Sequence, residues 1–178
     1  DTAVYVQQQQ QGTADAVLAA RPALREFADA GEGDVVVLYA DTPLIRAEPI
    51  AALRAALDAG AGIAVLGFHA ADPTGYGRLL TGPDGDLRAI REHNEASSEE
   101  LRVTLCNSGV LAFRCPDLLG LLDRIGNANA KREYYLTDAV EIGRVTGDGI
   151  LRVKMDGRIV AEVPVSAPVT LSPALSSA

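Results

Sequence analysis

The sequence is short of cysteine and of long apolar runs, and each shortage excludes a class of protein. Its two cysteines, Cys106 and Cys115, flank one apolar segment, and no cysteine or histidine cluster has the spacing of a zinc site. No run approaches the roughly 20 apolar residues that cross a bilayer, and the N-terminus does not look like a secretion signal. We therefore expect a reduced, cytoplasmic protein with no membrane partner.

Basic residues are also scarce. Sixteen Lys and Arg face 24 Asp and Glu, which gives a formal net charge of −8. This balance argues against a broad surface for nucleic acid, although backbone N–H groups, a metal ion or a few placed cations can still bind a phosphate locally. At 178 residues and 48% apolar content, the chain is long enough for one domain with its own core.

Strand-like and helix-like segments alternate in the first seventy residues. A short apolar segment at residues 3–6 precedes a helical pattern at 12–20, and a β-branched run at 35–39 precedes another at 48–59. A third apolar strand is expected at 63–68. This alternation predicts the α/β class, with a mostly parallel sheet and right-handed crossovers.

The remaining chain is less regular. Turn-forming residues predict a hairpin insertion that leads into a strand at residues 87–90, followed by a polar loop with one helical turn. Further segments are a strand at 105–113, helices at 116–125 and 136–145 around a polar loop, and a strand at 150–155. We expect one domain over residues 1–155 and a Pro, Ser and Ala-rich tail or linker over 156–178.

One carboxylate stands at the end of the strand that is predicted with least ambiguity. In the segment DVVVLYADTPLI, residues 34–45, the apolar run ends at Asp41, and a proline follows two residues later. Open α/β sheets bind ligands beyond the carboxyl ends of their strands, so Asp41 is a candidate ligand-binding residue. The alternative is that Asp41 only caps the turn before the next helix.

Other polar residues also allow both a ligand-binding and a purely structural interpretation. The glutamines from Gln7 onward, followed by Gly12 and Thr13, lie between a strand and a helix where amides can bind a base, but such runs are often plain surface. Gly77 belongs to a Gly-Tyr-Gly stretch that also suits a hairpin turn. Glu92 lies in an acidic stretch that suits a solvated face. An amide inside an apolar strand, at Asn107, is harder to dismiss, because a buried amide needs partners.

Taken in order, six segments resemble the uridylyltransferase domain of the bacterial bifunctional N-acetylglucosamine-1-phosphate uridylyltransferase/glucosamine-1-phosphate acetyltransferase. They are QQQQQGT, LYADTPLI, DPTGYGR, IREHNEAS, LCNSGVLAF and NANAKREYYLTDAV. The resemblance covers residues 3 to 150 and implies a Rossmann-like nucleotidyltransferase fold. It also implies that UTP and N-acetylglucosamine 1-phosphate are converted to UDP-N-acetylglucosamine and pyrophosphate. It leaves homo-oligomerisation of a full-length protein open.

The same resemblance implies a role for each candidate residue. Gln7 and Gly12 would contact uracil with Thr13 beside them, and Asp41 would hold a catalytic Mg²⁺. The amino-sugar site would be lined by Gly77, Glu92, Asn107, Tyr135 and Thr137. The chemistry suits these types, because in-line attack of one phosphate on another requires positioning and charge neutralisation and no nucleophilic side chain.

The sequence departs from the family pattern in ways that bear on activity. It has no first strand with the glycine-rich loop that wraps the triphosphate, no second metal-binding Asn after the last strand, and no acetyltransferase β-helix. Arg132 stands where the family commonly has glycine. We therefore expect an incomplete domain with little or no activity alone. The alternatives are another sugar or cofactor nucleotidyltransferase, a non-catalytic nucleotide-sugar-binding domain, or a structural remnant without ligand.

Overall fold

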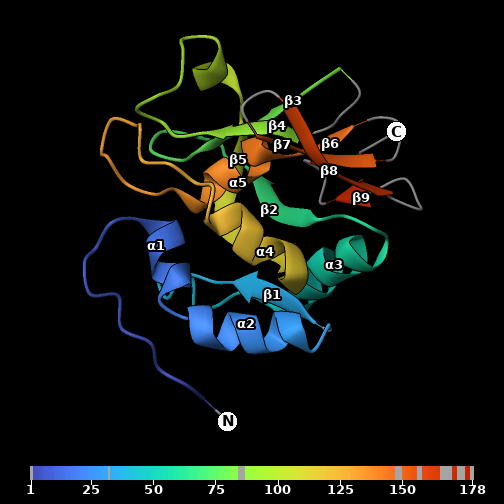
Figure 1. Ribbon diagram of the computed structural model, residues 1–178. Helices are drawn as coiled ribbons and strands as arrows, with labels where there is room; N and C mark the ends of the chain where they lie inside the picture. The colour runs from blue at the N-terminus through green and yellow to red at the C-terminus, as the bar shows by residue number, and fades with distance from the viewer. Residues whose placement is uncertain are drawn as a thin grey trace.

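A five-stranded sheet forms the centre of the computed structural model (Figure 1). The structure describes residues 2–31, 33–83, 87–146, 150–155, 158–164, 170–171 and 175–176. The strand order is β1-β5-β3-β4, and β2 pairs with β5 as well. The bounds are β1 Asp34–Val37, β2 Ile63–His69, β3 Arg78–Thr81, β4 Leu87–Arg91 and β5 Leu105–Arg114.

The direction of strand pairing differs from the expectation of a mostly parallel sheet. Each pairing among β1 to β5 that the structure describes is antiparallel, with β5 between β1 and β2. The strands β1 and β2, which a helix connects, run parallel to each other, but they are not neighbours because β5 lies between them. The alternation of strand and helix predicted their relative direction correctly. It carried no information about a later strand that inserts between them.

The strand β1 is less buried than an unbroken β-branched run predicts. Its four residues are half-buried, and Leu38 just beyond it is 45% exposed. Among the described strands, only β5 flanks β1. The β-branched composition of β1 therefore reported a strand correctly but overstated its burial.

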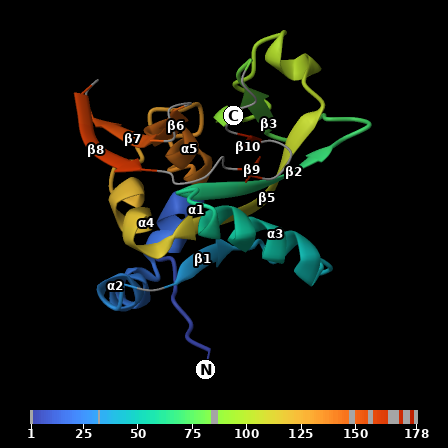
Figure 2. The same cartoon turned by 90° about the vertical axis from the view of Figure 1, so that its right-hand side faces the viewer.

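Helices pack around this sheet as their sequence spacing predicts. The helix α3 buries Leu53, Ala56 and Leu57, which are spaced one turn apart, and it lies across β1, β5 and β2 in Figure 2. Pro22 lies in the first turn of a second helix, where proline is tolerated because the N–H groups of the first turn have no partner within the helix. The helices are α1 Thr13–Leu18, α2 Arg21–Asp29, α3 Ala47–Asp58, α4 Cys115–Leu122 and α5 Ala139–Ile142, with 3₁₀ turns η1 Glu100–Arg102 and η2 Leu136–Asp138.

Two local expectations are wrong. Residues 3–6 are not a strand, and Val4 is 85% exposed, because no neighbouring strand accepts this segment among the described residues. The helix expected at 136–145 is divided into η2, α5 and the strand β6 (Gly143–Thr146). The hairpin insertion is confirmed as β3 and β4, although its turn lies partly outside the described residues.

A second sheet follows the central one along the chain. Its strands β6, β7 (Ile150–Met155) and β8 (Arg158–Pro164) pair antiparallel in that order. The strand expected at 150–155 is therefore confirmed. The segment expected as a tail contains β8 and the pair β9 (Thr170–Leu171) and β10 (Leu175–Ser176), and its other residues lie outside the described ranges. Within the described chain, no helix is long and apolar enough to cross a membrane.

The core lies between the sheet and its helices. Phe113 and Leu111 of β5 are fully buried, as are Leu57 of α3 and Leu118 of α4. The start of α4 is tied to α2, because the buried Cys115 thiol donates to the Leu24 carbonyl oxygen over 3.5 Å. Packing of this kind stabilises by roughly 1.5–3 kcal/mol for each large apolar side chain.

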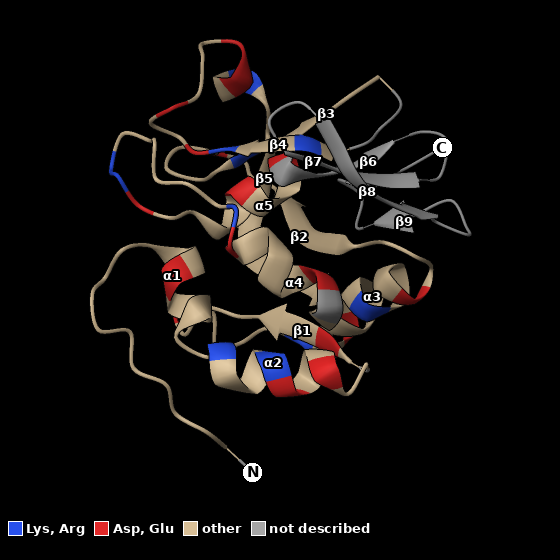
Figure 3. Ribbon diagram, viewed as in Figure 1, with Lys and Arg blue, Asp and Glu red and all other residues tan. Residues whose placement is uncertain are grey.

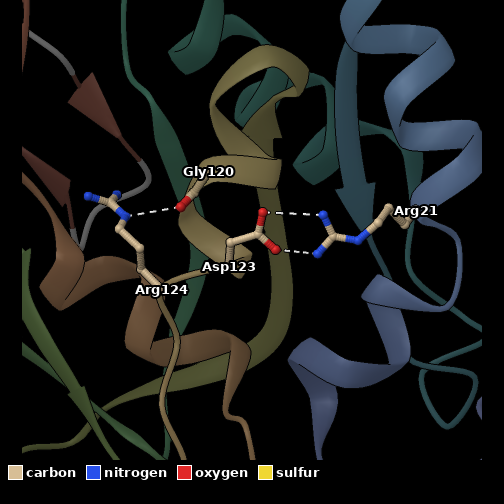
Figure 4. A network of polar contacts seen from close by, with 4 residues as sticks. All are labelled: Arg21, Gly120, Asp123 and Arg124. Atoms are coloured by element: carbon tan, nitrogen blue, oxygen red, sulfur yellow. Dashed lines mark hydrogen bonds and ion pairs between the residues drawn. The ribbon is translucent and has the colours of Figure 1, made fainter.

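A bidentate ion pair joins the same two helices at the surface. The Arg21 guanidinium of α2 donates to both carboxylate oxygens of Asp123, just beyond α4, and neighbouring Arg124 donates to the Gly120 carbonyl oxygen over 2.9 Å (Figure 4). The Arg21 side chain is 28% exposed and that of Asp123 56%. Solvent screening limits this pair to a modest contribution.

A double-mutant cycle measures that contribution. We expect Arg21→Ala and Asp123→Ala, alone and together, to give a coupling energy of about 0.5 to 1 kcal/mol in urea unfolding at low salt. The matched control is the pair Arg46 and Glu48, which lie 3.9 Å apart with both side chains more than three-quarters exposed. Its coupling energy should be close to zero. Equal coupling energies in the two cycles would contradict a structural role for the helix-joining pair.

Candidate nucleotide-sugar site

A cleft of about 710 Å³ opens beside the ends of β1, β4 and β5. Four loops, the start of α1, the 3₁₀ turn η2 and residues of β2 and β5 contribute to its walls. Its lining residues are Thr13, Tyr39, Asp41, Thr42, Phe68, Gly75, Tyr76, Gly77, Glu92, His93, Asn94, Glu95, Asn107, Ser108, Gly109, Ala130, Lys131, Glu133, Tyr135 and Thr137. Segments that are far apart in sequence therefore meet in one concave site, as small-ligand sites require.

Most of the residues singled out from the sequence lie in this cleft. They are Thr13, Asp41, Gly77, Glu92, Asn107, Tyr135 and Thr137. Two others, Gln7 and Gly12, are not among the lining residues. The Gln7 amide instead donates to the Gly12 carbonyl oxygen over 3.1 Å and to an Asp15 carboxylate oxygen over 2.7 Å. In this structure, Gln7 therefore organises the start of α1.

Gly12 has a packing requirement of its own. Its φ is +116°, and a Cβ at this position would lie 2.5 Å from the Tyr134 carbonyl oxygen and 2.7 Å from the Tyr134 nitrogen. The Tyr134 N–H donates to the Gln11 carbonyl oxygen over 2.7 Å, and the Ala14 N–H donates to the Tyr134 carbonyl oxygen over 2.9 Å. Glycine is needed because two backbones meet here. Contact of Gly12 with uracil remains a prediction.

Thr13 links three parts of the cleft. Its hydroxyl oxygen accepts a hydrogen bond from the Leu136 N–H over 2.8 Å, and it also bonds to the Tyr39 phenol. The Tyr39 ring lies so close to Gly109, whose φ is +82°, that a Cβ there would lie 2.7 Å from two ring carbons. Burial raises the pKa of Tyr39 above its usual value, and the charges of Glu92 and Asp41 raise it further. Tyr39 is therefore a neutral, fixed wall at physiological pH.

Asp41 lies in the turn that follows β1. That turn is closed by Thr42, whose N–H and hydroxyl both donate to the Tyr39 carbonyl oxygen over 3.2 and 2.9 Å. The helix α3 begins five residues later, after Arg46 at its N-cap. Asp41 is therefore not the N-cap residue of α3, and its exposed side chain lines the cleft.

Glu92 is the most enclosed carboxylate of the lining. Burial raises its pKa, a hydrogen bond donated by the Thr137 hydroxyl over 3.4 Å lowers it, the charge of Glu95 raises it and that of Lys131 lowers it. A Cβ on Gly77 would lie 3.5 Å from both Glu92 carboxylate oxygens, so the absence of a side chain leaves the carboxylate accessible from that direction. Glu92 can therefore accept hydrogen bonds from a ligand.

Asn107 is half-buried in β5 rather than fully buried. Its side-chain Oδ1 accepts a hydrogen bond from the Gly109 N–H over 3.0 Å, and its backbone N–H donates to the Gly77 carbonyl oxygen over 2.8 Å. The expected need of this amide for partners is therefore met partly within the strand. Asn107 and Asp41 nevertheless line the same cleft, which is the juxtaposition that a shared nucleotide and sugar site requires.

A tight loop at residues 127–135 contributes Ala130, Lys131, Glu133 and Tyr135 to the lining of the cleft. The Asn129 side chain bridges the loop to Glu133, and the Ala130 N–H donates to Glu95 Oε1 over 3.0 Å. Arg132 has φ +54°, the left-handed region that favours glycine. The positive φ at this position explains why glycine is common there in the resembled family.

The cleft carries an excess of negative charge. Asp41, Glu92, Glu95 and Glu133 line it, and Lys131 is the counterpart among its described lining residues. Figure 3 shows basic positions spread over α2, α3, β4 and the loops. Binding an anionic ligand here therefore needs additional positive charge.

The Asp41 carboxylate is compatible with binding of Mg²⁺. The described residues hold no group of three or more His, Cys, Asp and Glu side chains that could bind a metal ion. Magnesium, however, commonly takes one or two protein carboxylates and completes its shell with substrate phosphates and water. Asp41 fits that sparse ligation.

Several lining residues were not predicted from the sequence. They are Tyr39, Phe68, Tyr76, His93, Glu95 and Lys131. Tyr39 had a usable signal, because residues two apart in an extended chain share a face and Asp41 was already a candidate. Phe68 had none, since an aromatic at the end of an apolar strand is typical of core. His93 follows β4, and its Nδ1 is buried with no hydrogen-bond partner among the described residues.

The fold and this cleft define the class of protein. A family model described as Nucleotidyl transferase matches residues 1–142, and the chain belongs to that family. The fold is also similar to that of UDP-glucose pyrophosphorylase complexed with UDP-glucose, with a TM-score of 0.55 and 19% identity over 76% of this chain and 51% of the other. The α/β nucleotidyltransferase fold predicted by resemblance is confirmed.

The sequence of the chain is also similar to those of particular relatives. It is 55% identical over 174 residues to the "Bifunctional protein GlmU" of Azorhizobium caulinodans, covering 98% of this chain and 37% of that protein. It is 54% identical to the same-named protein of Xanthobacter autotrophicus, covering 92% and 35%. These relatives confirm the resemblance inferred from the six motifs. The chain spans little more than a third of their length.

The left-handed residue in the 127–135 loop gives a stability prediction. We expect Arg132→Gly to raise the unfolding free energy by about 0.5 to 1 kcal/mol, because glycine relieves the cost of positive φ. Arg132→Ala is the control, since it removes the same charge but keeps the Cβ. Thermal and urea unfolding should rank Gly above both Arg and Ala. An alanine variant as stable as the glycine variant would show that charge, and not backbone strain, is relieved.

Asp138 gives a pH prediction. Burial and the charges of Glu141, Glu95 and Glu92 raise its pKa from 3.8 to about 6. The folded state therefore binds this proton more tightly than the unfolded state, and this contribution to stability is lost as the pH rises from about 4 to about 6. Asp138→Asn should flatten that dependence and stabilise the protein at pH 7 by about 1 kcal/mol, allowing for partial solvent screening.

The control for this measurement is Asp29→Asn, the same chemical change at an exposed position on α2. In urea unfolding between pH 4 and 7, the unfolding free energy of Asp29→Asn should depend on pH in nearly the same way as that of the unmodified chain. A steep loss of stability between pH 4 and 6 that persists in Asp138→Asn would show that other groups cause it.

Proposed function

We propose that this chain carries the nucleotide-sugar half of a uridylyltransferase, which transfers a uridylyl group from UTP to N-acetylglucosamine 1-phosphate and releases pyrophosphate. One observation carries the proposal. Asp41, Glu92 and Asn107 line a single cleft in a nucleotidyl transferase that is 55% identical to a protein named Bifunctional protein GlmU.

Each lining residue has a task in that reaction. Thr13 lies at the cleft and would receive uracil, and contact of uracil with Gln7 and Gly12, which do not line the cleft, would follow only from the family resemblance. Glu92, Asn107, Tyr135 and Thr137 offer hydroxyl, amide and carboxylate groups to the sugar, and Gly77 keeps the path to Glu92 open. The residues bind and orient both substrates, and the attacking phosphate oxygen needs no general base.

Charge neutralisation is the limiting requirement. Two anions must meet in a cleft whose own charge is negative, so Mg²⁺ held by Asp41 would neutralise and orient the phosphates. Lys131 adds one positive charge at the cleft. The sequence contains no glycine-rich loop of the form found in the resembled family, and that loop supplies further cations. We therefore expect binding of nucleotide sugar but little turnover by these 178 residues alone.

Two alternatives share this cleft. Another sugar or cofactor nucleotidyltransferase would use the same Asp41 with a different base or sugar, and the fold likeness to UDP-glucose pyrophosphorylase is compatible with that. A non-catalytic domain would bind the nucleotide sugar without needing the metal. Binding preferences separate the first alternative, and metal dependence separates the second.

The test removes the carboxylate. Calorimetric titration of UDP-N-acetylglucosamine should show Mg²⁺-enhanced binding for the unmodified chain, and Asp41→Asn should abolish that enhancement while weakening metal-free binding less than twofold. We expect the loss to be at least about tenfold in Kd, or about 1.4 kcal/mol. Asp58→Asn, an equal charge change on the exposed side of α3, is the control.

Three outcomes would contradict the proposal in different parts. Mg²⁺ enhancement that survives Asp41→Asn removes Asp41 as the metal ligand. Tighter binding of a guanosine or cytidine sugar nucleotide would assign another base. Rapid pyrophosphate release by the unmodified chain from UTP, N-acetylglucosamine 1-phosphate and Mg²⁺ would show that the domain is functionally complete.

A further inference from the structure

One side chain connects two loops that contribute to different parts of the cleft wall. The loop at residues 92–104, which follows β4, and the loop at 127–135 lie on the left of the view in Figure 1, in yellow-green and in orange. Among the described residues, the hydrogen bond that joins these loops runs from the Ala130 N–H to Glu95 Oε1 over 3.0 Å. Glu95 and Ala130 both line the cleft. The Glu95 side chain therefore reaches from one wall of the cleft to another.

The loop that supplies the donor is held in place by its own contacts. The Asn129 side chain bonds to both the N–H and the carbonyl oxygen of Glu133, and the Arg132 N–H donates to the Asn129 carbonyl oxygen over 3.1 Å. Arg132 lies in the left-handed region, with φ +54°, which this closed turn maintains. The position of the Ala130 N–H is therefore set by the turn and does not depend on a ligand.

The backbone on either side of Glu95 is also held. The Glu95 N–H donates to the Glu92 carbonyl oxygen over 2.9 Å, which closes a turn. Two residues later, the Ser97 N–H donates to the Glu100 carboxylate over 2.7 Å, and the Glu100 N–H donates to the Ser97 hydroxyl over 3.3 Å. The hydrogen bond to Ala130 can therefore open by rotation of the Glu95 side chain, without rearrangement of either loop.

Opposing interactions act on the Glu95 carboxylate. Burial is the largest cause of the raised pKa values of Glu92, Tyr135 and Asp138, and the charge of Glu95 raises each of them further. The same interaction repels Glu95 whenever Glu92 or Asp138 is ionised. The Ala130 N–H attracts the carboxylate against this repulsion, and the contact lies at the surface, where water competes for it. These terms favour two arrangements of similar free energy, one closed and one open.

We propose that the Glu95 carboxylate is a latch between the two loops, and that a nucleotide sugar enters and leaves the cleft while this latch is open. The proposal rests on the proposed function for its ligand and adds a residue that controls the rates of ligand exchange. A latch that closes with and without ligand slows association and dissociation by similar factors, because both steps wait for the open arrangement. Glu95 is in this sense a positioning residue that acts through the 127–135 loop.

Amide hydrogen exchange at Ala130, measured by NMR on the ligand-free chain, reports the latch directly. We expect exchange at Ala130 to be at least fivefold faster in Glu95→Ala than in the unmodified chain, because the N–H has lost its acceptor. The Glu133 N–H, which Asn129 Oδ1 accepts over 3.0 Å, is the internal reference and should change less than twofold. Equal exchange at Ala130 in the two chains would overturn the latch.

The rates at which UDP-N-acetylglucosamine binds and dissociates, obtained from NMR line shapes of the whole chain with Mg²⁺, test the effect on the ligand. Glu95→Asp keeps the charge but shortens the side chain, whereas Glu95→Gln removes the charge but keeps an acceptor oxygen at the same reach. We expect Glu95→Ala and Glu95→Asp to raise both rates at least threefold and to change the Kd less than twofold. Glu95→Gln should keep both rates within twofold of those of the unmodified chain.

The matched control is Glu99→Ala, which removes an exposed carboxylate from the same loop at a position that is not among the lining residues. It should change neither rate and leave exchange at Ala130 as it is. Thermal unfolding shows whether each variant is folded. Because Glu95→Ala and Glu95→Asp make the same prediction independently, either of them decides the result if the other fails to fold.

The outcomes separate the latch from the function beneath it. Association that is as fast in Glu95→Gln as in Glu95→Ala would assign the effect to lost negative charge and contradict the latch. Faster dissociation with unchanged association would make Glu95 a ligand contact and contradict it as well, and in both cases the proposed function stands. An unmodified chain that binds no UDP-N-acetylglucosamine overturns the proposed function and, with it, control of that ligand by Glu95.

Discussion

The close approach of Gly12 to the backbone of Tyr134 is the contact on which the arrangement of the site depends. It brings the loop before α1 against the 127–135 loop, although more than a hundred residues separate them. The adjacent Thr13 hydroxyl then binds the Leu136 N–H and the Tyr39 phenol, and Tyr39 lies against Gly109. One glycine thus couples the candidate base-binding loop, the strand that delivers Asp41 and the sugar side of the cleft.

Electrostatics divide the cleft into parts with different demands. The proposed sugar side has carboxylate, amide and hydroxyl groups that suit a neutral, hydroxyl-rich ligand, and burial raises the pKa of Glu92 there. The proposed phosphate side has an acidic residue and, among the described lining residues, little positive charge of its own. Under the proposed function, such a site would hold a nucleotide sugar through its neutral portions and would depend on a cation for the phosphates. This division explains why binding and turnover are expected to separate in this chain.

The sequence predicted local elements better than their pairing. Apolar spacing located α3, and continuous apolar runs located β2 and β5, because burial imposes a period that the chain itself records. The insertion of β5 between β1 and β2 is a non-local choice that no window of sequence reports. The cleft residues Asp41 and Asn107 followed from strand-end placement and family resemblance. Phe68 and Tyr76, which also line the cleft, were not predicted from the sequence, since an aromatic residue at either position is typical of a core or a turn.

The central claim is that one cleft receives both the nucleotide and the sugar. Amide chemical shifts of the ¹⁵N-labelled chain, followed during titration with UDP-N-acetylglucosamine and Mg²⁺, test it directly. The account predicts that the amides of Thr13, Gly77 and Asn107 shift together with one dissociation constant. Shifts confined to one of these segments, or different constants for the nucleotide and sugar sides, would contradict it.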